Sequence, residues 1–235
     1  MNLHTLLGID PAQKEIVSVC GSGGKTTLVF ALARESCDAV PSAVFTTTHF
    51  RRPTGEKVTF TDPWDERECR AAWERGETVS TASAIPGEER KYGAPPEEVM
   101  RFLCREATAV YIEADGSRCM PLKYPAPWEP VIREETTHTV VVAGLSALGG
   151  EPEKTIHRLP LLREVMPFTQ HTVDEELTAR LLWLGYGRFD PVFLLNQADS
   201  PALVRRGESI AERLYALGAK KAVVTSLKKH LQPTP

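Results

Sequence analysis

Short apolar segments alternate with amphipathic ones along the chain, which is the pattern of an α/β fold. Runs of apolar and β-branched residues predict strands at 15–20, 43–47, 78–82, 109–114, 139–143, 192–195 and 222–225. Helical spacing of apolar positions predicts helices at 25–36, 65–75, 96–107, 174–184 and 202–217. Asp174 is the expected N-cap of the fourth helix. Strands this short and apolar, with helices between them, indicate a mainly parallel central sheet flanked by helices.

The segments between these elements are less regular. Residues 57–60 predict a hairpin strand, and residues 85–96, rich in proline, glycine and charge, predict a surface loop. Residues 115–130 contain four prolines and predict an ordered loop, while residues 154–167 match no element clearly. We expect a single domain over residues 1–235, with residues 55–95 as an insertion or small subregion.

The composition excludes several classes of protein. The 235 residues include 28 Lys and Arg against 31 Asp and Glu, for a net charge of −3, which argues against nucleic acid as a partner. The longest apolar stretches, such as Thr139–Leu148, fall short of the roughly 20 residues of a membrane-spanning helix. Residues 1–14 lack the features of a signal peptide. Five cysteines without a Cys-x-x-Cys pair indicate free thiols, so we expect a cytoplasmic protein.

A glycine-rich segment joins the first predicted strand to the first predicted helix. Glycines allow a tight turn whose N–H groups point at phosphate oxygens, and the helix start adds partial positive charge. Lys25 would neutralise the terminal phosphates, and the Thr26 hydroxyl would bind Mg²⁺. Val19 replaces the first glycine of the usual pattern G-x-x-x-x-G-K-[ST], and the alternative is a simple turn with an incidental lysine. The residues predicted to bind a nucleoside triphosphate are Gly21, Ser22, Gly23, Gly24, Lys25, Thr26 and Thr27.

Two carboxylates follow the apolar strand at 109–114. Glu113 and Asp115 lie at its C-terminal end, which in a parallel sheet is the edge where the phosphate loop also lies. There they can hold Mg²⁺ through water and orient an attacking water, and the N–H of Gly116 can contact the γ-phosphate. The alternative is a solvated acidic turn. We predict Thr26, Glu113 and Asp115 as metal ligands, with Lys25, Glu113 and Asp115 as catalytic residues.

A third motif, Asn196-Gln197-Ala198-Asp199, follows the strand at 192–195. In guanine-nucleotide proteins the pattern N-K-x-D stands at this place, and its Asp accepts hydrogen bonds that only guanine can donate. Gln197 replaces the Lys, and a simple Asn/Asp turn is the alternative. Thr225 and Ser226 resemble the next base-contacting loop, so the sequence favours GTP over ATP.

The remaining candidates rest on less specific patterns. His49, after Thr46-Thr47-Thr48, is a general acid/base candidate near the predicted phosphates. Residues 154–158 (KTIHR) read as a solvated basic turn, with a cationic phosphate contact as the alternative. Residues 115–130, with Arg118, Lys123 and Glu129, suggest a substrate or partner surface. Cys119 is expected to be inert, because no second thiol or His accompanies it in the sequence.

These motifs together resemble the YqeC family. GSGGKTT, TTTH, IEADGSR with PLK and EPVI, GLSALG and KTIHRL occur in that family's order over about Leu3–Thr225, most distinctively at Glu113–Ile132. The family is described as accessory or selenium-cofactor biosynthesis factors for selenium-dependent molybdenum hydroxylases. The resemblance implies a cytoplasmic maturation factor with a nucleotide-binding fold. Its expected partners are a nucleoside triphosphate and the client hydroxylase or that enzyme's cofactor-loading factors, with neither nucleic acid nor membrane.

Two wider resemblances point to different chemistry. The phosphate loop is similar to that of the Mur ligases and folylpolyglutamate synthetases, which use ATP to make acyl phosphates. Glu113-x-x-Gly116 and Asn196-x-x-Asp199 are similar to motifs of the nickel-insertion GTPases. We therefore predict a three-layer, P-loop NTPase-like fold and a Mg²⁺-dependent maturation factor that binds and hydrolyses GTP or ATP. The alternatives are an ATP-dependent small-molecule kinase or ligase, and a nucleotide-binding scaffold without turnover.

Overall fold

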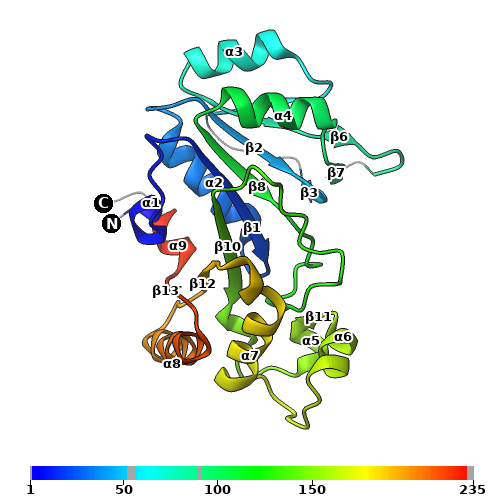
Figure 1. The fold of residues 1–235 in the computed structure, drawn as a ribbon, viewed down its shortest axis with the longest axis vertical. Helices are drawn as coiled ribbons and strands as arrows, with labels where there is room; N and C mark the ends of the chain where they lie inside the picture. Colours follow the sequence, from blue (N-terminus) through cyan, green and yellow to red (C-terminus); the bar gives the residue numbers. More distant parts are fainter. Residues whose placement is uncertain (1, 52–56, 89–90, 232–235) are drawn as a thin grey trace. The chain divides into compact units, whose positions relative to one another are not determined.

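The computed structural model describes residues 2–51, 57–88 and 91–231 (Figure 1). These residues group into two compact units that the chain enters alternately. Unit 1 contains the described residues of Met1–Val19, Thr26–Gly116 and Val131–His138. Unit 2 contains those of Cys20–Lys25, Ser117–Pro130 and Thr139–Pro235.

Parallel strands form the centre of unit 1. Neighbouring strands pair in the order β1–β8–β2–β5–β4, and every pair is parallel. Their bounds are β1 Glu15–Gly21, of which the last two residues belong to unit 2, β2 Ser42–Thr46, β4 Val58–Thr61, β5 Thr78–Thr81 and β8 Ala109–Glu113. A separate antiparallel sheet contains β3 (His49–Arg51), β7 (Lys91–Gly93) and β6 (Ser83–Ala84).

Unit 1 contains four helices within the described residues, of which α1 and α3 have a side-chain cap at the N-terminus. They are α1 Leu3–Leu7, α2 Lys25–Ser36, which begins on the last residue of unit 2's first segment, α3 Glu66–Glu74 and α4 Glu97–Glu106. The Asp65 side chain caps α3 by accepting hydrogen bonds from two of its free N–H groups. The apolar faces of α3 and α4 supply Cys69, Val99 and Leu103 to a core shared with the strand residues Phe45 and Ile112.

Unit 2 has a parallel order of its own, β13–β12–β10. These strands are β10 His138–Gly144, β12 Val192–Asn196 and β13 Lys221–Val224, and a short parallel pair adds β9 Leu122–Lys123 and β11 Ile156–His157. Its helices are α5 Pro152–Thr155, α6 Leu159–Val165, α7 Glu175–Tyr186, α8 Pro201–Leu217 and α9 Leu227–His230, with 3-10 turns η1 Leu145–Ala147 and η2 Gly187–Phe189. Asp174 caps α7 as predicted, since its carboxylate accepts a 2.7 Å hydrogen bond from Leu177 N. Helix α7 packs against α8, and α8 against β13.

The predicted α/β class, with a mainly parallel sheet and flanking helices, is confirmed. The predicted helix at 25–36 has the observed bounds, and the other predicted helices and strands lie within about two residues of theirs. The prediction of one domain over residues 1–235 stays a prediction. So does the subregion at 55–95, of which residues 55, 56, 89 and 90 lie outside the described part.

Three local predictions are wrong. The strand near residues 57–60 is not part of a hairpin: β4 pairs in parallel with β5, because α3 carries the chain back between them. The proline-rich segment 115–130 contains a strand, β9, and the loop predicted at 85–96 contains β7. These strands are two or three residues long, too short to leave a periodic signal. Helices α1 and α9, of five and four residues, were not predicted.

Candidate functional site

The loop between β1 and α2 closes tightly around glycines. Gly23 and Gly24 have φ of +87° and +136°, which L side chains rarely adopt. A Cβ atom on Gly23 would lie 2.5 Å from the backbone nitrogen of Gly144, and one on Gly24 would lie 2.5 Å from Nδ2 of Asn196. Neither position has room for a side chain, so the glycines are required by the conformation and by close backbone approach.

Lys25 turns its side chain back over this loop. The residue is buried, and its ammonium donates hydrogen bonds to the carbonyl oxygen of Gly21 at 2.9 Å and to Oγ of Ser117 at 3.2 Å. Ser22 holds the loop in place, because its N–H donates to Val142 O at 2.7 Å and its hydroxyl to Met120 O. A positive charge thus lies at the first residue of the loop, as phosphate binding requires.

The predicted base motif is attached directly to the loop. Asn196 donates from Nδ2 to Gly23 O at 2.7 Å and accepts at Oδ1 from the N–H of Leu227 at 2.9 Å. Asp199 is exposed and accepts a 2.5 Å hydrogen bond from Ser226 Oγ. The chain between them turns at Gln197, whose φ is +70° and whose Oε1 accepts from Ser146 N at 3.3 Å.

In unit 1, Thr26 and Glu113 come together. Thr26 Oγ1 donates to Glu113 Oε2 at 2.7 Å, and both are hard oxygen donors of the kind that Mg²⁺ prefers. Glu113 ends β8 and is buried, and its backbone carbonyl accepts from Thr46 Oγ1 at 2.9 Å. The donor set therefore fits a magnesium ion. Asp115, two residues further on, is fully buried.

The predicted residues Thr27 and His49 are also exposed. Thr27 lies on the first turn of α2, and His49 begins β3. Within the described ranges, the imidazole of His49 makes no side-chain hydrogen bond or ion pair, so the contacts found around Thr26 and Glu113 do not include it.

The structure also groups residues that the motifs alone do not bring together. Strands β9 and β11 pair with His157 opposite Lys123. Lys123 is fully buried and forms a 2.9 Å ion pair with Glu129, which Arg158 also contacts at 3.1 Å. Burial alone would raise the pKa of Glu129, but the hydrogen bond and charge of Lys123 hold it below its usual range. The prediction of a substrate or partner surface at residues 115–130 is therefore wrong for Lys123 and Glu129. Both side chains are buried, and each can be buried because the other carries the opposite charge.

The basic-turn interpretation of residues 154–158 holds only for Lys154. That side chain is exposed, whereas Ile156–His157 is a strand and Arg158 is partly buried. The sequence signal for the contact between Lys123, Glu129 and Arg158 was the unusual density of prolines and charges in residues 115–130.

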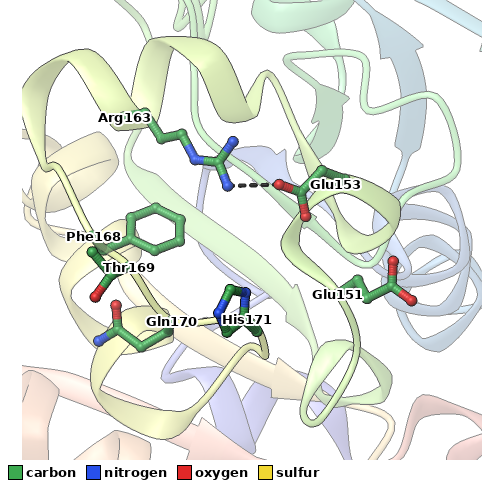
Figure 2. Close-up of a pocket in the computed structure, with 7 residues that line it drawn as sticks. All are labelled: Glu151, Glu153, Arg163, Phe168, Thr169, Gln170 and His171. Atoms are coloured by element: carbon green, nitrogen blue, oxygen red, sulfur yellow. Dashed lines mark hydrogen bonds and ion pairs between the residues drawn. The ribbon is translucent and has the colours of Figure 1, made fainter.

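The surface hollow shown in Figure 2 contains none of the predicted site residues. Its cationic and anionic groups neutralise one another in part, since Arg163 forms a 2.6 Å ion pair with Glu153. The lining residues are Glu151, Glu153, Arg163, Phe168, Thr169, Gln170 and His171.

The described part of the chain holds no group of three or more His, Cys, Asp or Glu side chains arranged as a metal centre. The five cysteines are free thiols, of which Cys119 is exposed and the other four are buried. None of the described helices has both the length and the apolar composition needed to span a membrane.

Comparison with known proteins decides the family. The family model described as "YqeC protein" matches residues 17–160, which include the phosphate loop, the Glu113–Gly116 segment and the β9–β11 pair. The chain belongs to the YqeC family. An uncharacterized protein YqeC from Escherichia coli (strain K12) is 33% identical over 171 residues, covering 67% of this chain and 64% of the relative.

A second relative outside the YqeC family has a named activity. A guanylate kinase from Myxococcus xanthus (strain DK1622) is 32% identical over 128 residues, covering 53% of this chain and 57% of the kinase. The matches therefore span less than two thirds of either relative's length. They support a nucleotide-binding, P-loop type of fold for this YqeC-family chain.

Proposed function

We propose that this YqeC-family protein binds and hydrolyses a nucleoside triphosphate with Mg²⁺ at the Gly21–Thr27 loop. The observation that carries the proposal is the position of the Lys25 ammonium over a glycine turn that has no room for side chains. Such a turn leaves backbone N–H groups and one positive charge for an anion to bind, which is the chemistry of a triphosphate site.

In this proposal each residue has a distinct task. Lys25 leaves the carbonyl of Gly21 for the terminal phosphates, while Ser22 keeps the loop attached to Met120 and Val142. Thr26 and Glu113 would hold a magnesium ion, which would supply positive charge to neutralise the phosphates. Asp115 orients the attacking water, and His49 is the general acid/base candidate at the surface.

The base is proposed to be guanine. Asn196 braces the phosphate loop, which leaves the exposed Asp199 to accept hydrogen bonds from the ring N1–H and 2-amino group of guanine. Ser226 orients the Asp199 carboxylate. Gln197 points its amide at Ser146, so it supports the turn and does not cover the base.

The cellular role is inferred from the family resemblance. We propose a maturation factor that assists selenium and molybdenum cofactor assembly on a selenium-dependent hydroxylase, with nucleotide turnover ordering and releasing the loops at Thr46–His49 and Glu113–Arg118. The client hydroxylase or its cofactor-loading factors would be its partners.

A second candidate is an ATP-dependent kinase or ligase that phosphorylates a small molecule. It is favoured by the Mur-ligase-like loop and by the similarity to a guanylate kinase. In that case nucleoside diphosphate release would depend on an added substrate, whereas a maturation factor hydrolyses the triphosphate without one.

Calorimetric titration with non-hydrolysable GTP and ATP analogues and Mg²⁺ tests the proposal. We expect binding below millimolar concentration, a preference for the guanine analogue, and affinity about 10- to 100-fold weaker in Lys25→Ala. The exposed Lys220 of unit 2 offers a matched control, because Lys220→Ala removes the same charge away from the loop.

Absence of binding by either analogue would overturn the proposed function. Binding without any hydrolysis would favour the scaffold without turnover. Phosphate release that appears only with a cosubstrate would favour the kinase or ligase.

A further inference from the structure

Strands β9 and β11 bring two basic segments of unit 2 into one place. The parallel pairing sets His157 opposite Lys123, although the two are more than thirty residues apart in the chain. Arg158 follows His157 directly and has a left-handed backbone, with φ of +63°. This turn ends the strand and directs the Arg158 guanidinium toward Glu129, at 3.1 Å.

Positive charge exceeds negative charge around this strand pair. The single carboxylate of Glu129 accepts contacts from Lys123 and from Arg158 on the same oxygen, Oε2. Arg118 adds a third positive charge that acts on His157, and its own side chain is exposed. Lys123 and Arg158 thus share one carboxylate oxygen, and a third cation, Arg118, acts on the neighbouring His157.

This excess of positive charge contributes to a lowered pKa of His157. Burial, together with the positive charges of Arg158, Lys123 and Arg118, lowers the pKa of His157 below its usual value, while Glu129 acts in the opposite direction. The positively charged form of the ring is therefore disfavoured here, and an added anion would act on the ring in the same direction as Glu129.

Arg158 retains hydrogen-bonding capacity beyond Glu129. Its Nε is buried without a hydrogen-bond partner among the described residues. Its guanidinium lies 5.4 Å from the ring centroid of Trp128, whose side chain is 70% exposed. A planar guanidinium stacked in this way is held in orientation while its remaining N–H groups stay available for an anion.

The same segment is fastened to the phosphate loop. Ser117 accepts from the Lys25 ammonium at 3.2 Å, and the carbonyl of Met120 accepts from the Ser22 hydroxyl. Between these two attachments the chain passes through two consecutive left-handed residues, Arg118 and Cys119, with φ of +50° and +61°. Arg118 is thus carried on a turn that is held at both ends by the loop.

We infer that Arg118, His157 and Arg158 form a second anion-binding site that takes the phosphate group of a small-molecule substrate. Two guanidinium groups and an imidazole N–H offer more donors than a carboxylate accepts, and they suit the tetrahedral dianion of a phosphate monoester. The site's attachment to the phosphate loop gives the ligand its role, as the second substrate of nucleotide turnover. That role rests on the second candidate function, the kinase or ligase, but binding at the site does not depend on it.

Proton NMR titration of the His157 ring in the full-length protein tests the site, with inorganic phosphate as the probe. The His157 signal is assigned by its loss in His157→Gln. Phosphate should raise the pKa of His157, because an added dianion offsets the surrounding positive charge. The shift should disappear in Arg118→Gln and in Arg158→Gln. It should persist in Arg163→Gln, a matched change in the nearby hollow of Figure 2.

The Lys25→Ala variant separates this site from the phosphate loop. A phosphate-dependent shift that persists in Lys25→Ala, and is lost in Arg118→Gln, supports the second site whether or not the loop binds nucleotide. A shift lost in Lys25→Ala but kept in both arginine variants would place phosphate in the loop and overturn the inference. No shift in the wild-type protein would overturn it as well, and circular dichroism of each variant verifies that it is folded.

Discussion

The side-chain amide of Asn196 donates a 2.7 Å hydrogen bond to the carbonyl oxygen of Gly23. Its other atom, Oδ1, accepts from the N–H of Leu227, so one side chain joins the glycine turn to the first turn of α9. Asn196, the bracing residue of the predicted base motif, thereby supports the Gly21–Thr27 loop.

Asn196→Asp should weaken triphosphate binding, because it replaces the donor facing the Gly23 carbonyl with a carboxylate oxygen. We expect a loss of about 1–3 kcal/mol in the free energy of unfolding, and a comparable loss in nucleotide affinity. Urea unfolding and calorimetry measure the two effects. Asn2→Asp is the isosteric control, since an aspartate caps α1 as well as the asparagine does. Unchanged stability and affinity in Asn196→Asp would contradict the bracing role.

Glu113→Gln should raise the Mg²⁺ concentration needed for nucleotide binding by roughly tenfold, with little effect on binding measured without the metal. The amide oxygen can still accept from Thr26, but it lacks the negative charge that the cation requires. Titrating Mg²⁺ at fixed nucleotide gives the measurement, with Glu134→Gln, a carboxylate of the same unit outside the loop contacts, as control. An unaltered Mg²⁺ dependence would show that Glu113 is not a metal ligand.

Asp199→Ala should abolish any preference for GTP over ATP while leaving ATP affinity unchanged. The exposed carboxylate is the group proposed to accept hydrogen bonds from guanine. Adenine offers no such donors to it, so its removal should not change the affinity for ATP. Competition between the two nucleotides measures the ratio, and Asp190→Ala serves as an exposed aspartate control. A preserved ratio would refute the base assignment.

The stability of unit 1 should depend on the charge of Glu35. Burial alone would raise the pKa of this carboxyl, but hydrogen bonds from the His4 side chain and the N–H groups of Leu3 and His4 lower it below its usual value. A carboxyl with a lowered folded-state pKa stabilises the fold above its unfolded pKa and loses that effect as pH falls through the folded value.

The difference in unfolding free energy between wild type and Glu35→Gln should therefore shrink between about pH 5 and pH 3. Denaturant unfolding at several pH values measures it, with the exposed Glu74→Gln as control. A difference that stays constant over this range would show that the hydrogen bonds act without the charge.

Of the five thiols, Cys119 should react first with an alkylating reagent. Burial raises the pKa of Cys69 to about 12 and of Cys104 to about 11, so neither forms thiolate near neutral pH. Mass spectrometry after brief iodoacetamide treatment should find one fast adduct, absent in Cys119→Ser. Fast modification of a buried cysteine would indicate local opening of the native fold.

The parallel strands and the longer helices could be predicted from the sequence because the spacing of apolar residues within each of them is typical of its type. The helix at 25–36 begins immediately after the glycine turn, and Asp174 and Gly218 mark the start of α7 and the end of α8. The three-residue β7 and the two-residue β9 and β11 form only because partner segments lie opposite them, and no local pattern encodes that pairing.

The candidate site likewise contains some features that local sequence predicts and others that depend on distant segments. The strand–turn–helix at residues 21–27 could be predicted from one segment, because its glycines and the start of its helix are local features, while its role in binding stays a prediction. The burial of Lys123 with Glu129, the contact of Arg158 and the attachment of Ser117 to Lys25 join segments distant in sequence. Charge alone predicts such residues to be exposed, until a partner of opposite sign is known.

The alternation of the chain between two compact units limits how this protein can be divided. The chain passes from one unit to the other five times, at the boundaries after Val19, Lys25, Gly116, Pro130 and His138. Neither unit is therefore a continuous segment, and a chain shortened at any one boundary would lack parts of at least one unit. Lys25 and Thr26, bonded neighbours, belong to different units, so a truncation that separated the units at this boundary would cut the Gly21–Thr27 segment in two.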